Sequence, residues 1–208
     1  MSKTYYLWDL ADTLFPERWD SVGSGCSDII SYMTTLGYDQ KTITPGQFEL
    51  AYEQPYRKGF FALSLIPGFT EVLPWAKHNG YFTSGHHEQN LWRNEQIQKK
   101  YHINIFDYIK EGFSAFDFGS INQKTAAMFT DILNTLHERG YTDIVYTDDK
   151  ETKCELFFNA ITKLQKEGVR INGRTYHRAA HCGMKHAHIT DIRDLFELRD
   201  KEAGIVGK

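Results

Sequence analysis

The sequence predicts an α/β protein in which a parallel β-sheet carries helices on both faces. Short apolar runs, typical of buried strands, alternate along the chain with longer segments that have apolar residues at helical spacing. This order favours parallel pairing, because each helix can serve as the crossover between two strands. The length of 208 residues, 41% of them hydrophobic, suits one such domain with a small inserted module.

The first expected strand covers residues 5–8, an apolar and aromatic run that stops at Asp9. In the segment that follows, Gly37 ends one helical pattern and Pro45 opens another. The first of these patterns consists of Ile29, Ile30, Met33 and Leu36. Because the segment contains no convincing strand, we expect residues 16–66 to be a small helical cap. The core would then consist of residues 1–15 and 67–208.

The rest of the chain is expected to supply further helices and strands in alternation. The helices have apolar residues three and four positions apart and cover residues 69–78, 90–101, 125–139, 156–165 and 192–198. The strands are short apolar runs at residues 81–83, 144–147 and 175–177. Asn79-Gly80 is expected to end the helix before it, and residues 103–113 fit neither pattern.

Composition argues against several classes of protein. The net charge is -3 and the 24 basic residues are scattered, which disfavours a nucleic-acid or membrane-surface binder. No apolar stretch is long enough to span a bilayer, and the first residues lack an apolar signal core, so a cytoplasmic location is expected. The cysteines are odd in number and widely spaced, which supports neither a disulfide framework nor a zinc knuckle. They are Cys26, Cys154 and Cys182.

Polar residues follow three of the expected strands. The first strand ends in Asp9, the second in Thr83-Ser84 and the third in Asp148-Asp149. Reactive groups of parallel sheets collect at the carboxyl ends of the strands, so these residues are expected to meet. Carboxylates held together repel one another unless a cation neutralises them, and Mg²⁺ prefers oxygen ligands. A carboxylate in such a site can also attack phosphorus, giving an aspartyl-phosphate.

These pieces, in this order, resemble the haloacid dehalogenase-like (HAD) hydrolase superfamily. Residues 8–15, Trp-Asp-Leu-Ala-Asp-Thr-Leu-Phe, are similar to its first motif, an apolar strand followed by Asp-x-Asp-x-Thr-Leu. Residues 81–85, Tyr-Phe-Thr-Ser-Gly, resemble the second motif, and Gln123-Lys124-Thr125 lies where the family has its phosphate-contacting lysine. Residues 145–149, Val-Tyr-Thr-Asp-Asp, resemble the acidic fourth motif. The resemblance spans roughly residues 5 to 165 and implies a Rossmann-like core.

The resemblance implies a role for each matching residue. Asp9 would be the nucleophile and a magnesium ligand, and Lys124 would bridge Asp9 and the phosphate. Thr83 and Ser84 would bind substrate, and Thr13 would hold the loop together. The implied magnesium site comprises Asp9, Ala11, Asp148 and Asp149. The implied substrate is a small anion, phosphorylated or otherwise activated.

The chain departs from the family pattern at two positions. The general-acid aspartate expected two residues after Asp9 is Ala11, and Asp12 lies one residue later, where glycine is usual. General acid–base assistance contributes about 10²–10⁴ in rate, so an ordinary phosphatase without it would be slow. In the fourth motif, Lys153 stands where an acid or amide is expected, and it could pair with Asp148 or Asp149 and weaken metal binding.

Several other residues have both a chemical and an ordinary interpretation. Some family members lack the second aspartate, and one branch with alanine there forms a Schiff base on a cap lysine. Lys41 or Lys58 could take that role, although solvated surface is the favoured interpretation. Arg57 could reach an anionic substrate, but a surface charge is again favoured. His86 and His87 could replace the missing acid, although a place at a helix start is the more ordinary interpretation.

A group of four histidines and one cysteine near the C-terminus could bind zinc, because neutral imidazole and thiolate are good zinc ligands. Its members are His177, His181, Cys182, His186 and His188. The spacing fits no known metal motif, and a polar loop is the favoured interpretation.

Two hypotheses for the function therefore remain. One is a magnesium-dependent HAD-like hydrolase, which the retention of Asp9, Thr83, Lys124 and Asp149 favours. The other is a catalytically impaired HAD-like protein with a binding or regulatory role, which Ala11 and Lys153 favour. Fold analogy alone does not decide between them.

Overall fold

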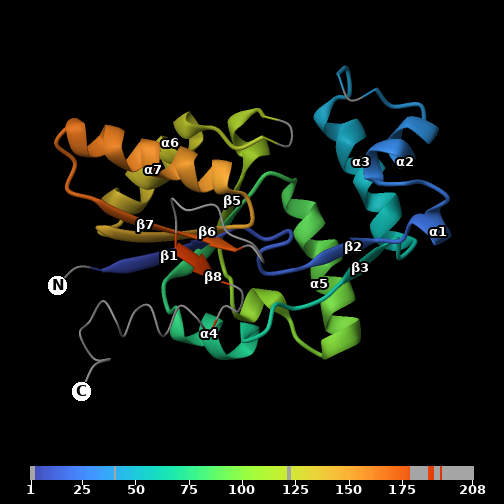
Figure 1. The fold of residues 1–208 in the computed structure, drawn as a ribbon, viewed down its shortest axis with the longest axis horizontal. Helices are drawn as coiled ribbons and strands as arrows, with labels where there is room; N and C mark the ends of the chain where they lie inside the picture. Colours follow the sequence, from blue (N-terminus) through green and yellow to red (C-terminus); the bar gives the residue numbers. More distant parts are fainter. Residues whose placement is uncertain (1–2, 40, 121–122, 179–186, 190–192, 194–208) are drawn as a thin grey trace.

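One sheet of parallel strands organises the computed structural model, which describes residues 3–39, 41–120, 123–178, 187–189 and 193. The sheet has six strands in the order β5-β4-β1-β6-β7-β8 (Figure 1). They are β1 (Thr4–Trp8), β4 (Asn79–Thr83), β5 (Gly112–Ser114), β6 (Asp143–Asp148), β7 (Asn172–Arg178) and β8 (Ala187–Ile189). The predicted parallel α/β fold is confirmed. Within the described ranges, no helix is both long and apolar enough to cross a membrane.

Helices cover both faces of the sheet (Figure 1). Helices α6 (Ala126–Glu138) and α7 (Glu151–Lys166) lie on one face, and α4 (Phe69–Trp75) and α5 (His87–Tyr101) pack against the other. Side chains alternate between the two faces along each strand. In β1, Leu7 packs in the cluster with α6 and α7, whereas Trp8 packs in the cluster with α4 and α5. This two-sided burial fixes the register of the strands and hence the positions of the residues at their ends.

The segment between β1 and α4 forms a smaller unit at one side of the sheet (Figure 1). Its helices are α1 (Ser21–Ser24), α2 (Ile29–Thr35) and α3 (Pro45–Arg57), and it has its own buried cluster of Met33, Ile43, Phe48 and Ala51. The expectation that this segment has no strand is wrong, because β2 (Glu17–Trp19) pairs antiparallel with β3 (Phe61–Leu63). Each strand has only three residues, too few to show a period in the sequence. The division at residues 16–66 stays a prediction.

Other element boundaries differ from the sequence prediction by a few residues. Asn79 and Gly80 do not end a helix but open β4, and the ambiguous residues 103–113 contain the 3₁₀ helix η1 (Ile105–Asp107) and the start of β5. A second 3₁₀ helix, η2 (Ala115–Phe118), follows β5. Helix α5 begins three residues earlier than expected, and α7 begins at Glu151. The helix expected over residues 192–198 lies outside the described residues, apart from Arg193.

Candidate active site

The carboxyl ends of three neighbouring strands bring the predicted site residues to one edge of the sheet. Strand β1 lies between β4 and β6, and Trp8 is level with Tyr81 on one side and Thr147 on the other. Asp9 therefore leaves β1 beside the ends of β4 and β6, where Thr83 and Asp148 lie. All three side chains are buried, with 5% of Asp9, 2% of Thr83 and 1% of Asp148 exposed.

The loop after β1 is a tight turn that orients the Asp9 carboxylate. The backbone N–H of Asp9 donates to the carbonyl of Thr147 at 2.8 Å, and both Leu14 and Phe15 donate to the carbonyl of Leu10. The hydroxyl of Thr13 donates to Asp9 Oδ2 at 3.1 Å and is itself fully buried. Thr13 thus contacts the carboxylate directly, in addition to lying within the turn.

Asp12 is turned away from a general-acid position. Its φ of 57° places it in the left-handed region, which aspartate tolerates better than most residues. Its Oδ1 accepts a hydrogen bond from the backbone N–H of Glu17 at 3.0 Å, so the carboxylate stabilises the turn. Ala11, which stands at the position of the family's general acid, has only a methyl side chain and can transfer no proton.

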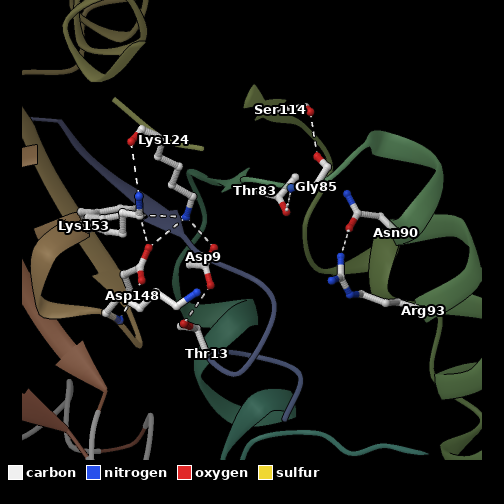
Figure 2. Close-up of polar contacts among 12 residues, drawn as sticks. Asp9, Thr13, Thr83, Gly85, Asn90, Arg93, Ser114, Lys124, Asp148 and Lys153 are labelled. Carbon is white, nitrogen blue, oxygen red and sulfur yellow. Dashed lines mark hydrogen bonds and ion pairs between the residues drawn. The ribbon is translucent and has the colours of Figure 1, made fainter. Parts of the chain in front are cut away.

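Lys124 is the centre of the polar contacts at this edge of the sheet (Figure 2). Its ammonium lies 2.5 Å from Asp9 Oδ1 and 2.9 Å from Asp148 Oδ2, and it donates to the hydroxyl of Tyr146 at 2.9 Å. The Tyr146 hydroxyl donates in turn to Asp148 Oδ2. Lys124 is 3% exposed, so this cation neutralises two carboxylates within the protein interior.

Electrostatics at the site follow from burial and from these contacts. Burial raises the pKa of Asp9 to about 6, although the Lys124 charge opposes that rise. Burial alone would lower the pKa of Lys124, but the carboxylates of Asp148 and Asp9 outweigh it and raise the pKa. For Asp148, burial is outweighed by Lys124 and the Tyr146 hydroxyl, so its pKa is lowered. Lys124 is therefore held as a cation beside an ionised Asp148.

Three carboxylates converge in a way that suits a hard divalent cation. Oxygen atoms of Asp9, Asp148 and Asp149 lie within 4.8 Å of one another. Asp148 is already engaged, because its Oδ2 accepts from Lys124 and Tyr146 and its Oδ1 accepts from the backbone of Lys150 at 2.8 Å. Burial and the negative charges of Asp9 and Asp148 raise the pKa of Asp149 to about 7. This donor set fits Mg²⁺, and Ala11 could add only a backbone carbonyl oxygen.

The loop after β4 is arranged to present the Thr83 hydroxyl. Thr83 Oγ1 accepts from the backbone N–H of Gly85 at 3.2 Å, which leaves its proton available for another acceptor. Ser114 Oγ donates to the carbonyl of Gly85 at 2.7 Å and fixes the loop from β5 (Figure 2). Ser84 is half-buried, and its side chain makes no hydrogen bond within the described part of the chain.

Lys153 and His177 contact the backbone of the site. Lys153 Nζ donates to the carbonyl of Lys124 at 3.3 Å, and in the described residues it forms no ion pair with Asp148 or Asp149. His177 Nε2 donates to the carbonyl of Asp149 at 2.8 Å. Both contacts hold the backbone of a site residue, and the pairing of Lys153 with the acidic motif that the sequence left possible is not seen among the described residues.

The other candidates lie away from these carboxylates or in ordinary structural contacts. Lys58 Nζ donates to the hydroxyl of Tyr32 at 3.0 Å, Arg57 pairs with Glu53, and Lys41 is exposed. These contacts agree with the surface interpretation of Lys41, Arg57 and Lys58.

The histidines after the second motif lie at the start of α5. His86 caps that helix, and His87 is within hydrogen-bond distance of Tyr81 and Asp117. Of the C-terminal group, His181, Cys182 and His186 lie outside the described residues, and His188 is described only as part of β8.

Sequence reasoning missed two residues of this region. Tyr146 lies two positions before Asp148 on a strand, so both side chains point to the same face, and this spacing could have indicated the contact. Arg93 is buried on α5 and pairs with Glu17 of β2 at 2.6 Å. No local pattern predicts that pair, because its members are 76 residues apart in the sequence.

Comparison with known proteins identifies the fold. No family model matches the sequence, and no curated protein matches it. Among solved structures, the HAD family enzyme BT-2542 from Bacteroides thetaiotaomicron is 14% identical with a TM-score of 0.54, covering 94% of this chain and 99% of its own. A structure of the same enzyme in complex with magnesium and inorganic phosphate has a TM-score of 0.52 at 13% identity, covering 88% of this chain and 97% of its own. UTR4 protein from Saccharomyces cerevisiae is 13% identical with a TM-score of 0.53, covering 90% of this chain and 97% of its own.

The resemblance inferred from the motifs is thus confirmed at the level of fold: the chain has the HAD-like fold.

Proposed function

We propose that the protein is a magnesium-dependent HAD-like hydrolase that acts on a small anionic metabolite through Asp9 as nucleophile. The observation that carries this proposal is the grouping of Asp9, Lys124, Asp148 and Asp149 at one edge of the sheet, next to the end of β4 that presents Thr83. A buried ammonium among three carboxylates is a costly arrangement if it serves stability alone. With Mg²⁺ bound to offset the carboxylate charges, the arrangement is suited to holding a doubly charged phosphoryl group in place.

The chemistry proceeds in two displacements at phosphorus. A carboxylate oxygen of Asp9 attacks, the bond from phosphorus to the leaving-group oxygen breaks, and that oxygen departs with the electron pair. Water then attacks the aspartyl-phosphate, and the bond between phosphorus and Asp9 breaks to return the carboxylate and release inorganic phosphate. Mg²⁺ held by Asp9, Asp148 and Asp149 would neutralise charge on the phosphoryl oxygens. Lys124 and Thr83 donate to those oxygens, and Ser84 lies beside them in the same loop.

The missing acid restricts the substrate. Because Ala11 carries no proton, the departing oxygen leaves as an anion unless another donor reaches it. Asp12 does not, since its carboxylate bonds to the backbone of Glu17. We therefore infer that the natural substrate has a stabilised leaving group, as in an enol, acyl or aryl phosphate.

The segment from residue 16 to residue 66 acts in this proposal as the cap over a core made of residues 1–15 and 67–208. One contact supports the assignment: the hydroxyl of Tyr56 on α3 donates to Glu17 on β2 at 2.7 Å, and Glu17 pairs with Arg93 on α5. The cap side chains thereby reach the helix that follows the Thr83 loop.

A second candidate function is binding or regulation without turnover. Ala11 favours it, because a protein that only binds phosphate needs no general acid. It predicts that phosphate binds with Mg²⁺ but that no ester is hydrolysed.

A direct assay separates the two candidates. Purified protein is tested against alkyl, aryl and acyl phosphates and 2-haloacids, with and without Mg²⁺, beside Asp9→Asn. Asp12→Asn is the matched control, because asparagine tolerates the left-handed φ and keeps the oxygen that accepts from Glu17. We expect magnesium-dependent activity that Asp9→Asn abolishes and Asp12→Asn keeps. Equal rates for wild type and Asp9→Asn on every compound would refute the hydrolase proposal.

A further inference from the structure

Helix α5 buries three polar side chains near its amino end. Gln89, Asn90 and Arg93 are 2%, 1% and 3% exposed. Buried polar groups in proteins are almost always hydrogen-bonded, since an unsatisfied donor costs about 1–3 kcal/mol. Three such residues within five positions of one helix are therefore expected to have hydrogen-bond partners.

Protein partners account for only part of their hydrogen-bonding capacity. Gln89 Nε2 and Asn90 Nδ2 are buried, and Gln89 Nε2 makes no hydrogen bond within the described part of the chain. The Asn90 amide donates toward the hydroxyl of Tyr81, which opposes the rise that burial causes in the pKa of Tyr81. Asn90 Oδ1 accepts from Arg93 Nη1 at 2.9 Å, which fixes the direction of the Asn90 amide. Both atoms are amide nitrogens with two N–H donors each, so Asn90 Nδ2 keeps one donor beyond its contact with Tyr81.

Arg93 also has donors to spare. Its Nε donates to Glu17 Oε1 at 2.6 Å and one Nη1 hydrogen is used by Asn90, so two of the five N–H groups are engaged within the described residues. The same Glu17 oxygen also accepts from the hydroxyl of Tyr56, so the Glu17 carboxylate is hydrogen-bonded to both Arg93 and Tyr56. The guanidinium is held rigidly by these contacts, with its remaining donors in a planar fork.

This group of donors lies beside the loop after β4, which carries Thr83. A Cβ at Gly85 would collide with the amide of Gln89, so the Gln89 side chain lies directly against the loop that carries Thr83. Figure 2 shows Asn90 and Arg93 on the side of Thr83 opposite to Lys124 and Asp148. Burial raises the pKa of Asp9, and the Arg93 charge is among those that lower it, so the guanidinium acts on the nucleophile across the site.

The chemistry of the donors indicates the ligand group. Most of the spare groups are donors, namely the Gln89 and Asn90 amide N–H groups and the remaining guanidinium N–H groups of Arg93, which favours a group with several acceptor oxygens. The amino end of a 15-residue helix further favours negative charge. Lys124 and Thr83 already serve the phosphoryl group. A planar carboxylate matches the amide and guanidinium donors that remain.

We propose that Gln89, Asn90 and Arg93 form a subsite for a carboxylate on the leaving group, so that the substrate class is phosphorylated or similarly activated carboxylic acids. This inference rests on the proposed function, because it places the subsite next to the phosphoryl site of that reaction. It adds recognition residues on α5 to the substrate-binding residues Thr83, Ser84 and Lys124 that the sequence predicts.

Binding of matched non-hydrolysable probes tests the proposal without requiring turnover. Calorimetry in excess Mg²⁺ compares ethylphosphonate with phosphonoacetate, and propylphosphonate with 3-phosphonopropionate. Hydrogen bonds to a charged group contribute about 1.5–3 kcal/mol, so we expect the carboxylate member of at least one pair to bind about tenfold tighter or more. Gln89→Met and Arg93→Lys should each reduce that preference to about threefold or less, with little change for the alkylphosphonates.

Gln98→Met is the matched control, since it makes the same change at an exposed position of α5. Near-ultraviolet circular dichroism establishes that each variant is folded, and Gln89→Met, which breaks no ion pair, decides the result if Arg93→Lys is unstable. Equal affinity within both pairs overturns the carboxylate subsite and leaves the hydrolase proposal standing. A preference that both variants keep also overturns it. If neither inorganic phosphate nor any phosphonate binds, the proposed function itself fails.

Discussion

Replacing Lys124 with methionine tests the electrostatic centre of the site. Methionine keeps much of the length and apolar surface of lysine and removes only the ammonium. In the native protein that ammonium lies 2.5 Å from Asp9 and 2.9 Å from Asp148, and the side chains of the two aspartates are only 8% and 1% exposed. The variant therefore leaves two buried carboxylates without their common counter-ion.

The expected loss follows from the burial of the partners. Breaking a buried ion pair by removing one member costs about 3–5 kcal/mol, because the remaining charge stays desolvated and unpaired. That is a large share of the about 5–15 kcal/mol by which a domain is usually stable. Mg²⁺ should restore part of the loss, since it supplies positive charge to the same carboxylates.

Urea unfolding followed by tryptophan fluorescence measures this change, with the slope of the transition as a check on two-state behaviour. Lys163→Met is the matched control, because Lys163 is 60% exposed and its only ion pair in the described residues is a 3.9 Å contact with Glu167. We expect the control to change the free energy of unfolding by less than about 0.5 kcal/mol. A loss below about 1 kcal/mol for Lys124→Met, or equal stabilisation of variant and wild type by Mg²⁺, would refute the argument.

Three further predictions concern other parts of the chain. Ala11→Asp should raise kcat/KM for alkyl phosphates by about 10²–10⁴ and change it little for nitrophenyl phosphate, whose leaving group needs no proton; equal gains for both would contradict the role given to this position. Burial raises the pKa of the Cys154 thiol to about 12, so iodoacetamide at pH 8 should label half-buried Cys26 but label Cys154 only in denaturant, as peptide mass spectrometry can show. Gly80→Ala should lower the free energy of unfolding by about 1–3 kcal/mol, because a Cβ there meets a backbone carbonyl at 2.9 Å and a buried tyrosine hydroxyl. Gly46→Ala, in open space on a helix, should instead be neutral or gain up to about 1 kcal/mol, and thermal melts of both variants check the contrast.

The parallel sheet could be predicted from sequence because its strands have local signatures. Residues 5–8 and 144–147 are apolar runs that end in aspartate, and the helix between Thr125 and Gly140 has a clear apolar stripe. Parallel pairing puts Asp9, Thr83 and Asp148 at the same edge of the sheet, and the strand order β4-β1-β6, which no local pattern contains, makes them neighbours.

The details of the site depend on contacts that no local pattern contains. Asp12 shows this for the backbone: its left-handed φ explains why glycine is usual there, but the sequence does not reveal that the carboxylate would turn to the Glu17 N–H. Lys153 is a second example, in which the partner of a charged side chain could not be predicted. The sequence suggested a pairing with the acidic motif, whereas the side chain donates to the carbonyl of Lys124. A long flexible side chain has several partners within reach, and only the packed structure selects one.

The short ribbon of β2 and β3 has a consequence for how the chain can be altered. Its two strands are the points where the polypeptide leaves the region of the sheet and returns to it, and Trp19 lies opposite Phe61. Opposed residues of antiparallel strands are only about 4.5–5.5 Å apart. A two-residue turn such as Asn-Gly could therefore join Trp19 to Phe61 and excise everything between them. The ribbon thus offers one paired attachment point for a replacement segment, which would also have to restore the packing of α3 against α5.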